Sequence, residues 1–157
     1  MSAAEPLLTP ETRPMRSSDL DRVMAIEEAS FSTPWSRTSF RNLMGRGDAD
    51  LWVTTVDGQL VGYSVVWYVG DESELGNLAV SPAWRRRGLG QWQLDRAMER
   101  ALEQGARRIF LEVRVSNRGA QDLYQRGGFV QIGIRRRYYR QPVEDARVMC
   151  LDLTRHE

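Results

Sequence analysis

Apolar residues recur at helical spacing in three parts of the chain. The first helix is expected to begin near Ser18, because Ser18-Asp-Leu-Asp resembles a capping box with Asp21 in its third position. The second follows the break at Pro34 and ends at Gly45, and the third begins at Gln91 and ends at Gly105. The residues expected to face the core are Leu20, Val23, Met24 and Ile26 in the first helix, Phe40, Leu43 and Met44 in the second, and Leu89, Leu94, Ala97, Met98, Ala101 and Leu102 in the third.

Runs of β-branched and aromatic residues between these helices predict strands. Residues 51–56 and 59–68 are expected to pair as a hairpin, because Asp57-Gly58 is typical of a two-residue turn. Residues 12–16 form an expected edge strand, since proline is excluded from central strands. The other expected strands are residues 75–80, 108–114, 129–134 and 146–153, with a short helix from Asn117 to Gly127 and a polar loop between the last two strands.

The order of these elements predicts an α/β fold built on a mixed, mostly antiparallel seven-stranded sheet. The third helix is a crossover between residues 75–80 and 108–114, so these two strands are expected to run parallel, with helices on both faces. Ligands of such sheets tend to bind where strands diverge at their carboxyl ends. We expect a single domain over residues 12–157, preceded by a flexible tail at residues 1–11.

The amino-acid composition excludes or disfavours several classes of function. The 22 basic and 21 acidic residues nearly balance, which disfavours a nucleic acid or membrane partner, and every basic residue is arginine, which excludes lysine chemistry. With one cysteine, Cys150, and one histidine, His156, the chain offers no metal-ligand spacing and no Ser-His-Asp pattern. Without an apolar run long enough for a membrane span or a leader pattern, a cytoplasmic protein is expected.

A strand, a turn and a helix N-terminus follow one another between Glu74 and Gly90. Gly88 and Gly90 permit a close backbone approach, and the first-turn N–H groups of a helix favour an anion. The pattern lacks the lysine of a P-loop, and Gln93 stands where a dinucleotide-binding loop has glycine. These residues predict an anion site, although arginines before a helix are also common on solvated surfaces.

Several motifs resemble those of the GNAT acyltransferases over roughly residues 13–153. Arg85-x-x-Gly88-x-Gly90 resembles their acetyl-CoA diphosphate loop, and residues 111–117, Leu-Glu-Val-Arg-Val-Ser-Asn, followed by Leu123-Tyr124 and Gly128-Phe129, resemble a second signature. Residues 30–36 and the pattern Arg137-Tyr138-Tyr139 with Glu144-Asp145-Ala146 and Met149 resemble the RimI type, the ribosomal-protein alanine Nα-acetyltransferases. Gln91-Trp92-Gln93 departs from the smaller residues usual in that helix turn, and Gly119 and Gln121 stand where alanines are commoner.

The resemblance implies the GNAT fold, in which the two central parallel strands split into a V, and transfer of an acetyl group from acetyl-CoA without a metal. It implies as acceptor a protein N-terminus, the alanine of ribosomal protein S18. The cofactor residues it implies are Leu78, Ala79, Val80, Arg85, Arg86, Arg87, Gly88, Leu89, Gly90, Gln91 and Asn117; the substrate residues are Phe31, Trp35, Tyr138 and Tyr139.

Acetyl transfer to an amine needs a base, because an α-amino group with a pKa near 8 is mostly protonated at neutral pH, and an acid for the leaving thiolate. Glu112 is the candidate base, acting directly or through a water; it shares a strand face with Phe110 and Arg114, and the competing interpretation is a surface glutamate paired with Arg114. Tyr124 is the candidate acid, against a role in core packing, and Asn117 also fits a helix cap.

Two other functions remain open at this stage. The first is a GNAT acetyltransferase of a small-molecule amine such as a polyamine. The second is a non-catalytic module that binds RNA or the ribosome through residues 85–87 and 135–137.

Overall fold

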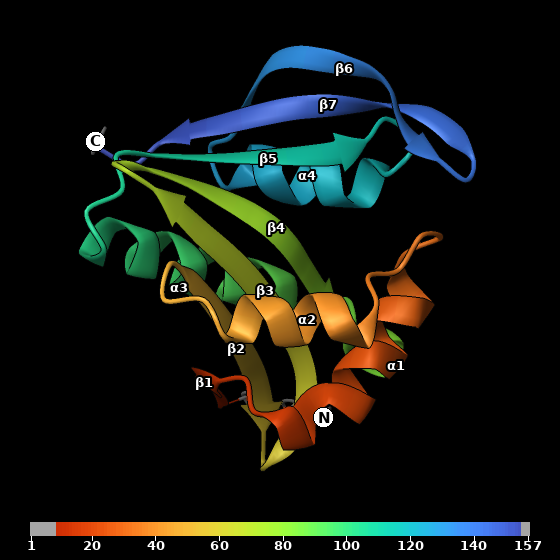
Figure 1. Ribbon diagram of the computed structural model, residues 1–157, viewed down its shortest axis with the longest axis vertical. Helices are drawn as coiled ribbons and strands as arrows, with labels where there is room; N and C mark the ends of the chain where they lie inside the picture. The colour runs from red at the N-terminus through yellow and green to blue at the C-terminus, as the bar shows by residue number, and fades with distance from the viewer. Residues whose placement is uncertain (1–8, 155–157) are drawn as a thin grey trace, which may run out of the picture.

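The computed structural model describes residues 9–154. They form one seven-stranded sheet in the order β1-β2-β3-β4-β5-β7-β6, with helices on both faces (Figure 1). Every neighbouring pair is antiparallel except β4 and β5, as the crossover predicted. The elements are β1 (Pro10–Pro14), α1 (Leu20–Ser30), α2 (Arg37–Met44), β2 (Ala49–Val56), β3 (Gln59–Val69), β4 (Glu72–Val80), α3 (Leu89–Glu103), β5 (Arg108–Arg114), α4 (Arg118–Arg126), β6 (Val130–Arg140) and β7 (Val143–Asp152), with 3-10 turns at Ser17–Asp19 and Pro82–Trp84.

The hairpin between β2 and β3 turns on the predicted pair. Asp57 has φ 51° and Gly58 φ 79°, the left-handed conformations that a tight two-residue hairpin turn requires. The strand at the sheet edge begins at Pro10, two residues before its predicted start, and pairs with β2 from Pro10–Val56 to Pro14–Trp52. Most of the predicted N-terminal tail lies outside the described residues.

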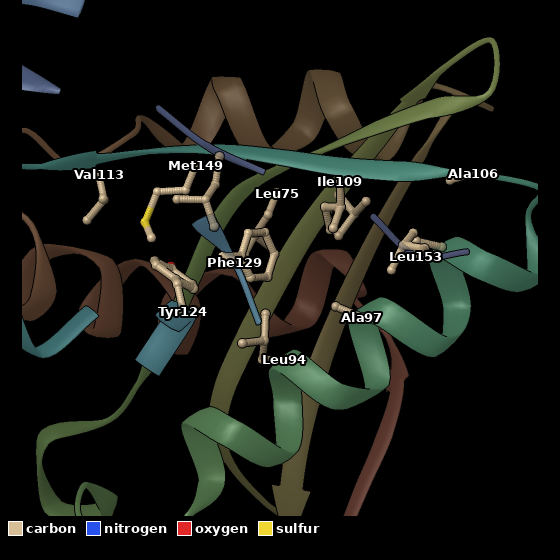
Figure 2. Packing of buried hydrophobic residues seen from close by; sticks show 13 residues of the cluster. Leu75, Leu94, Ala97, Ala106, Ile109, Val113, Tyr124, Phe129, Met149 and Leu153 are labelled. Carbon is tan, nitrogen blue, oxygen red and sulfur yellow. The ribbon is translucent and has the colours of Figure 1, made fainter. Parts of the chain in front are cut away.

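Two apolar cores lie on opposite faces of the sheet. α1 and α2 cover β2 and β3, where Leu20, Phe40 and Tyr63 are fully buried. α3 and α4 cover the other face, and Figure 2 shows Leu94 and Ala97 of α3 pointing toward Ile109, Phe129 and Tyr124. Among the predicted core residues of α3, Leu102 is instead 42% exposed; it lies one residue before the end of the helix and lines a surface hollow beside Leu151 and Leu153.

The predicted capping box at Ser18 is wrong. Asp19 makes the cap instead: its carboxylate accepts a hydrogen bond from the backbone N–H of Arg16 at 2.7 Å and two from the guanidinium of Arg13 at 2.7 and 2.8 Å. The ion pair with Arg13 holds the pKa of Asp19 below its usual range. Arg13, which belongs to β1, therefore helps to hold the residue that directly precedes α1.

The last two strands are longer than predicted, and the polar loop between them is reduced to a turn. β6 continues through Tyr138 and Tyr139, with Tyr139 paired to Glu144. The ladder shifts register between Arg135 and Tyr139, where Arg137 has φ 53° and donates its N–H to the carboxylate of Asp145 at 2.9 Å. Because β6 is the edge strand and exposes most of its residues, it needs no apolar alternation, and the sequence pattern resembles a loop.

Among residues 9–154, no helix has the length and apolar character needed to cross a membrane.

Candidate active site

The central parallel strands separate after three residue pairs. β4 and β5 pair at Glu72–Arg108, Ser73–Ile109 and Glu74–Phe110, and they diverge beyond this point (Figure 1). From Leu75 onward β4 keeps its ladder with β3 only, so the backbone edge that faces β5 has no strand partner. This is the predicted V-shaped split, and a cleft of about 500 Å³ opens at it.

Gly76 allows two tryptophan rings to pack directly against the backbone of β4 in the wall of this cleft. The ladder between β3 and β4 shifts register at this point, with Val65 opposite Asn77 and Val66 opposite Leu75. A Cβ on Gly76 would lie 2.2 Å from the ring of Trp67 and 3.0 Å from that of Trp35. Only a residue without a side chain fits beneath the two indoles, which stack with ring centroids 6.3 Å apart.

The anion-type loop follows directly at the end of β4. Arg86 has φ 63° and Gly88 φ 81°, and the first helical hydrogen bond of α3 runs from Trp92 N–H to Gly88 O at 3.0 Å. No side chain of the described residues caps this helix, so the N–H groups of its first turn, at Leu89, Gly90 and Gln91, are left for a ligand. This local geometry is what an anion such as a diphosphate requires.

The arginines of the loop differ in where their side chains lie. Arg85 turns back into the protein and donates to Val80 O and to Ser30 Oγ, both at 3.0 Å, so it braces the loop against β4 and α1. Arg86 and Arg87 are both exposed, and the guanidinium of Arg87 lies over the Trp84 ring at 4.9 Å. The loop therefore offers an anion its backbone N–H groups and only part of the positive charge of its three arginines.

The unusual turn Gln91-Trp92-Gln93 packs without strain on the sheet. Gln93 is buried, accepts a hydrogen bond from Thr54 Oγ1 at 2.6 Å and donates to Ala79 O at 3.1 Å. Gln91 bonds along the helix to Asp95 at 2.9 Å, and Trp92 lies against Arg96. A buried amide thus ties the start of α3 to β2 and β4.

Glu112 lies on β5 just past the split and lines the cleft. Its carboxylate is 3.3 Å from Arg135 Nε, so the competing interpretation of a glutamate paired with Arg114 is wrong. The interaction of the Tyr138 hydroxyl with Glu112, followed by burial, raises the pKa of Tyr138 to about 12. Glu112 is therefore oriented by β6, and it keeps one face toward the cleft.

Tyr124 reaches the same cleft from α4. It is only 8% exposed, its ring lies 5.7 Å from that of Phe129, and burial raises the pKa of its hydroxyl well above the ordinary value. The hydroxyl hence keeps its proton at neutral pH. Both interpretations of this residue hold in part, since the ring packs in the core while the residue lines the cleft.

Asn117 also lines the cleft and caps α4. Its Oδ1 accepts a hydrogen bond from Ala120 N–H at 3.1 Å, as the cap interpretation predicted. The Nδ2 group has no partner within residues 9–154, which leaves a donor for a ligand.

Three charged residues that line the cleft were not among the predicted site residues: Glu27, Arg114 and Glu74. Glu27 is buried in α1 and accepts hydrogen bonds from Trp35 N–H at 2.8 Å, from Asn77 Nδ2 at 2.8 Å and from the Tyr63 hydroxyl. Burial raises its pKa, and the three hydrogen bonds oppose that rise. A signal was present, because Glu27 stands seven residues after Leu20 on the apolar stripe of α1.

Arg114, the second, joins the two segments that roof the cleft. Its guanidinium donates to Pro142 O and to Glu144 Oε2 at 3.0 Å, and to Thr33 Oγ1 and Gln141 O at 3.3 Å. It also lies 4.2 Å from the centre of the Tyr139 ring. Arg114 thereby connects the loop after α1 to the β6–β7 hairpin, and no local sequence pattern indicates this.

The structure brings together most of the predicted site residues. Glu112, Tyr124, Asn117, Leu78, Phe31, Trp35, Tyr138 and Tyr139 all line the one cleft. Ala79, Val80 and residues 85–91 are not in its lining; they continue from it along β4 and the loop into α3. The arrangement is a track from a helix N-terminus, along an unpaired strand edge, to a carboxylate and a tyrosine hydroxyl.

A split parallel pair, with a helix N-terminus at one end and a carboxylate and a tyrosine hydroxyl at the other, fits an acyltransferase-type site. Comparison with known proteins agrees: the profile described as the acetyltransferase (GNAT) family matches residues 20–129. The chain belongs to this family.

Two relatives are similar over nearly their whole length. A Bacillus subtilis protein, provisionally named a ribosomal protein bS18-alanine N-acetyltransferase, is 42% identical over 90% of this chain and 94% of its own. The crystal structure of the ribosomal-protein-S18-alanine N-acetyltransferase from Escherichia coli has a TM-score of 0.85 and 30% identity, and covers 95% of this chain and 97% of its own.

Acetyl-CoA is the acetyl donor of this family, and the residues present fit it. Arabidopsis thaliana NAA60 in complex with acetyl-CoA has the same fold, with a TM-score of 0.79 and 20% identity over 92% of this chain and 99% of that one. The unpaired edge of β4 after Leu75 can hold an extended amide-containing arm, and the free first-turn N–H groups of α3 can hold phosphates.

Proposed function

We propose that this protein transfers the acetyl group of acetyl-CoA to the α-amino group of a protein N-terminus, the alanine of ribosomal protein bS18. The proposal is supported above all by one observation: Glu112 and Tyr124 line a single cleft at the split between β4 and β5. The names of the two relatives supply the acceptor. Such a reaction would take place in the cytoplasm, where ribosomal proteins are made.

Residues of the donor side would bind and aim the thioester. Backbone groups of Leu78, Ala79 and Val80 would pair with the pantetheine arm as an added strand, and one N–H there would donate to the thioester oxygen. Backbone N–H groups of residues 86–91 would hold the diphosphate, with Arg85 bracing the loop through Val80 O. The free Nδ2 of Asn117 would donate to the same arm.

Proton transfers would fall to the two residues across the split. Glu112 would take a proton from the acceptor ammonium, directly or through a water, so that the neutral amine can attack the thioester carbon. Tyr124, which burial keeps protonated, would give its proton to the departing sulfur, and the second proton that the nitrogen loses as the amide forms would restore the Tyr124 hydroxyl. Direct transfer without a covalent enzyme intermediate is consistent with the absence of any cysteine from the cleft lining.

The acceptor would enter between the two roof segments. Phe31 and Trp35 come from one, Tyr138 and Tyr139 from the other, and the four rings would frame its first residue. The small-amine and RNA-binding alternatives are not favoured, because the names of the relatives give a protein acceptor.

The test is acetylation of the N-terminal peptide of bS18 followed by mass spectrometry. We expect one added acetyl group at the α-amine, none on a peptide whose N-terminus is blocked, and none on spermidine. Acetylation of spermidine without acetylation of the peptide, or saturable RNA binding without affinity for acetyl-CoA, would overturn the proposal.

A further inference from the structure

A second hollow of about 220 Å³ adjoins the cleft on the open face of β4 and β5. The two share Trp67, Glu74 and Glu112, so a chain lying in the cleft next to Glu112 has direct access to the second hollow. We call this second hollow the side groove. Its lining is Trp67, Val69, Glu72, Ser73, Glu74, Phe110, Glu112, Arg135 and Val148.

The side groove combines an apolar wall with acidic ends. Trp67, Phe110 and Val148 supply aromatic and aliphatic surface, and Glu74 stands beside Phe110 in the parallel register. Glu112 follows Phe110 by two residues and shares its strand face, so Glu74 and Glu112 are diagonal neighbours. Such a wall accommodates a long side chain with an aliphatic or planar stem and a charged end.

Glu74 is the carboxylate shared by the cleft and the side groove that forms no ion pair within residues 9–154. Its Oε2 accepts one hydrogen bond, from Trp67 Nε1 at 3.0 Å. Glu112, the other shared carboxylate, has Arg135 at 3.3 Å. Burial, followed by the like charge of Glu112, raises the pKa of Glu74, and the hydrogen bond from Trp67 and the charge of Arg135 oppose that rise.

We propose that Glu74 is a specificity residue, and that its carboxylate receives the cationic side chain, arginine or lysine, of the acceptor's second residue. The α-amine would lie at Glu112, and the next side chain along the acceptor would enter the side groove with its stem on Trp67 and Phe110. This inference rests on the proposed function, because it presumes a peptide acceptor. It assigns to Glu74 a role separate from proton transfer.

The test compares kcat/KM for three peptides that differ only in their second residue: arginine, glutamine or glutamate. For the unmodified protein we expect the arginine peptide to exceed the glutamine peptide about tenfold, with the glutamate peptide lowest. In Glu74→Gln the ratio of kcat/KM for the arginine peptide to that for the glutamine peptide should fall to about twofold or less. In Glu74→Arg the glutamate peptide should become the best of the three.

Acetyl-CoA binding by each variant shows that it is folded, and Glu28→Gln, at an exposed carboxylate of α1 outside both hollows, is the matched control that should keep the preference for arginine. Equal rates of the unmodified protein on all three peptides would overturn the inference and leave the proposed function intact. So would an equal fall on all three in Glu74→Gln, since Glu74 would then hold the α-ammonium. If the unmodified protein acetylates no peptide at all, the proposed function fails and the inference fails with it.

Discussion

The two sides of the cleft are built in different ways. The proposed donor side is mainly one continuous segment, from Leu78 on β4 through the loop to Gln91 on α3, and apart from Asn117 it would bind through backbone atoms. The proposed acceptor side is assembled from side chains of five separate segments: the loop after α1, β3, β4, β5 and the β6–β7 hairpin. A local stretch of sequence thus encodes the first, and long-range contacts encode the second.

This difference predicts how each side responds to substitution. A backbone site tolerates changes of side chain and is sensitive to changes in φ and ψ, as at Gly88. An assembled site depends on the few side chains that connect its parts, chiefly Arg114 and Glu27. Single substitutions should therefore separate donor binding from acceptor binding.

The largest effect is expected for Tyr124→Phe, at the junction of the two sides. Losing the hydroxyl should lower kcat by about 10²- to 10⁴-fold, the usual contribution of a positioned acid. The ring packing on Phe129 is retained, so the affinity for acetyl-CoA and the thermal stability should stay close to those of the unmodified protein. Single-turnover kinetics measures the loss of rate, and calorimetry measures the affinity for acetyl-CoA. An unchanged rate in Tyr124→Phe would mean that Tyr124 serves only in core packing.

Arg114→Gln should act on the acceptor side alone. It removes the charged hydrogen bonds to Glu144 and Thr33 that hold the two roof segments together, each worth about 1.5–3 kcal/mol. We expect the acceptor KM to rise about tenfold, with acetyl-CoA affinity unchanged. Arg114→Lys should recover part of the loss, and Arg100→Gln, which breaks an ion pair with Asp50 outside the cleft, should leave both constants unchanged. A weakened acetyl-CoA affinity in Arg114→Gln would break the separation between the two sides.

Gly88→Ala tests the donor side in the same manner. At φ 81° an added Cβ meets no neighbouring atom, so its cost is the left-handed backbone itself, about 1–2 kcal/mol. We expect acetyl-CoA affinity to fall about fivefold and the acceptor KM to stay constant. Gly47→Ala, which has open space and no positive φ, is the control. An acceptor KM that shifts together with acetyl-CoA affinity would contradict the account.

The smallest effect is expected for Glu27→Gln, and it depends on pH. Burial raises the pKa of Glu27 in the folded protein above its pKa in the unfolded chain. As the pH rises above about 4, Glu27 therefore ionises in the unfolded chain while it is still protonated in the folded protein, and the free energy of unfolding falls until the folded-state pKa is passed. Glutamine cannot ionise, so the variant should gain stability relative to the unmodified protein between about pH 4 and pH 7. Each pKa unit corresponds to about 1.4 kcal/mol. Urea denaturation at several pH values measures the free energy of unfolding of both proteins. A difference between them that does not change with pH would contradict the prediction.

The sequence predicted the fold around the loop before α3 well, because the determinants of that local structure are neighbouring residues. The glycine spacing before α3, the crossover and the hairpin at Asp57-Gly58 each depend on neighbouring residues, and the fold follows from their order. The acceptor side was predicted only as a set of aromatic residues. Arg114 bonds to Thr33, 81 residues away, and to Gln141, 27 residues away, and such pairings leave no periodic signal.

One prediction and one alternative interpretation are overridden in the same way. Asp19, rather than Ser18, forms the capping interactions and is held by Arg13 of β1, and Glu112 is paired with Arg135 of β6 rather than with Arg114. In both places a residue from another strand overrides the local pattern. Glu27 differs, because its place on a buried stripe could have been recognised from spacing alone.

The account's central claim is that acetyl transfer occurs at the split, with Glu112 as the base. Glu112→Gln preserves the shape of the side chain and removes its basicity, so the most direct measurement is its kcat and acetyl-CoA affinity beside those of the unmodified protein. We predict that kcat at neutral pH falls by at least about 10²-fold, while acetyl-CoA affinity stays within about twofold. Full peptide acetylation by Glu112→Gln would contradict the claim.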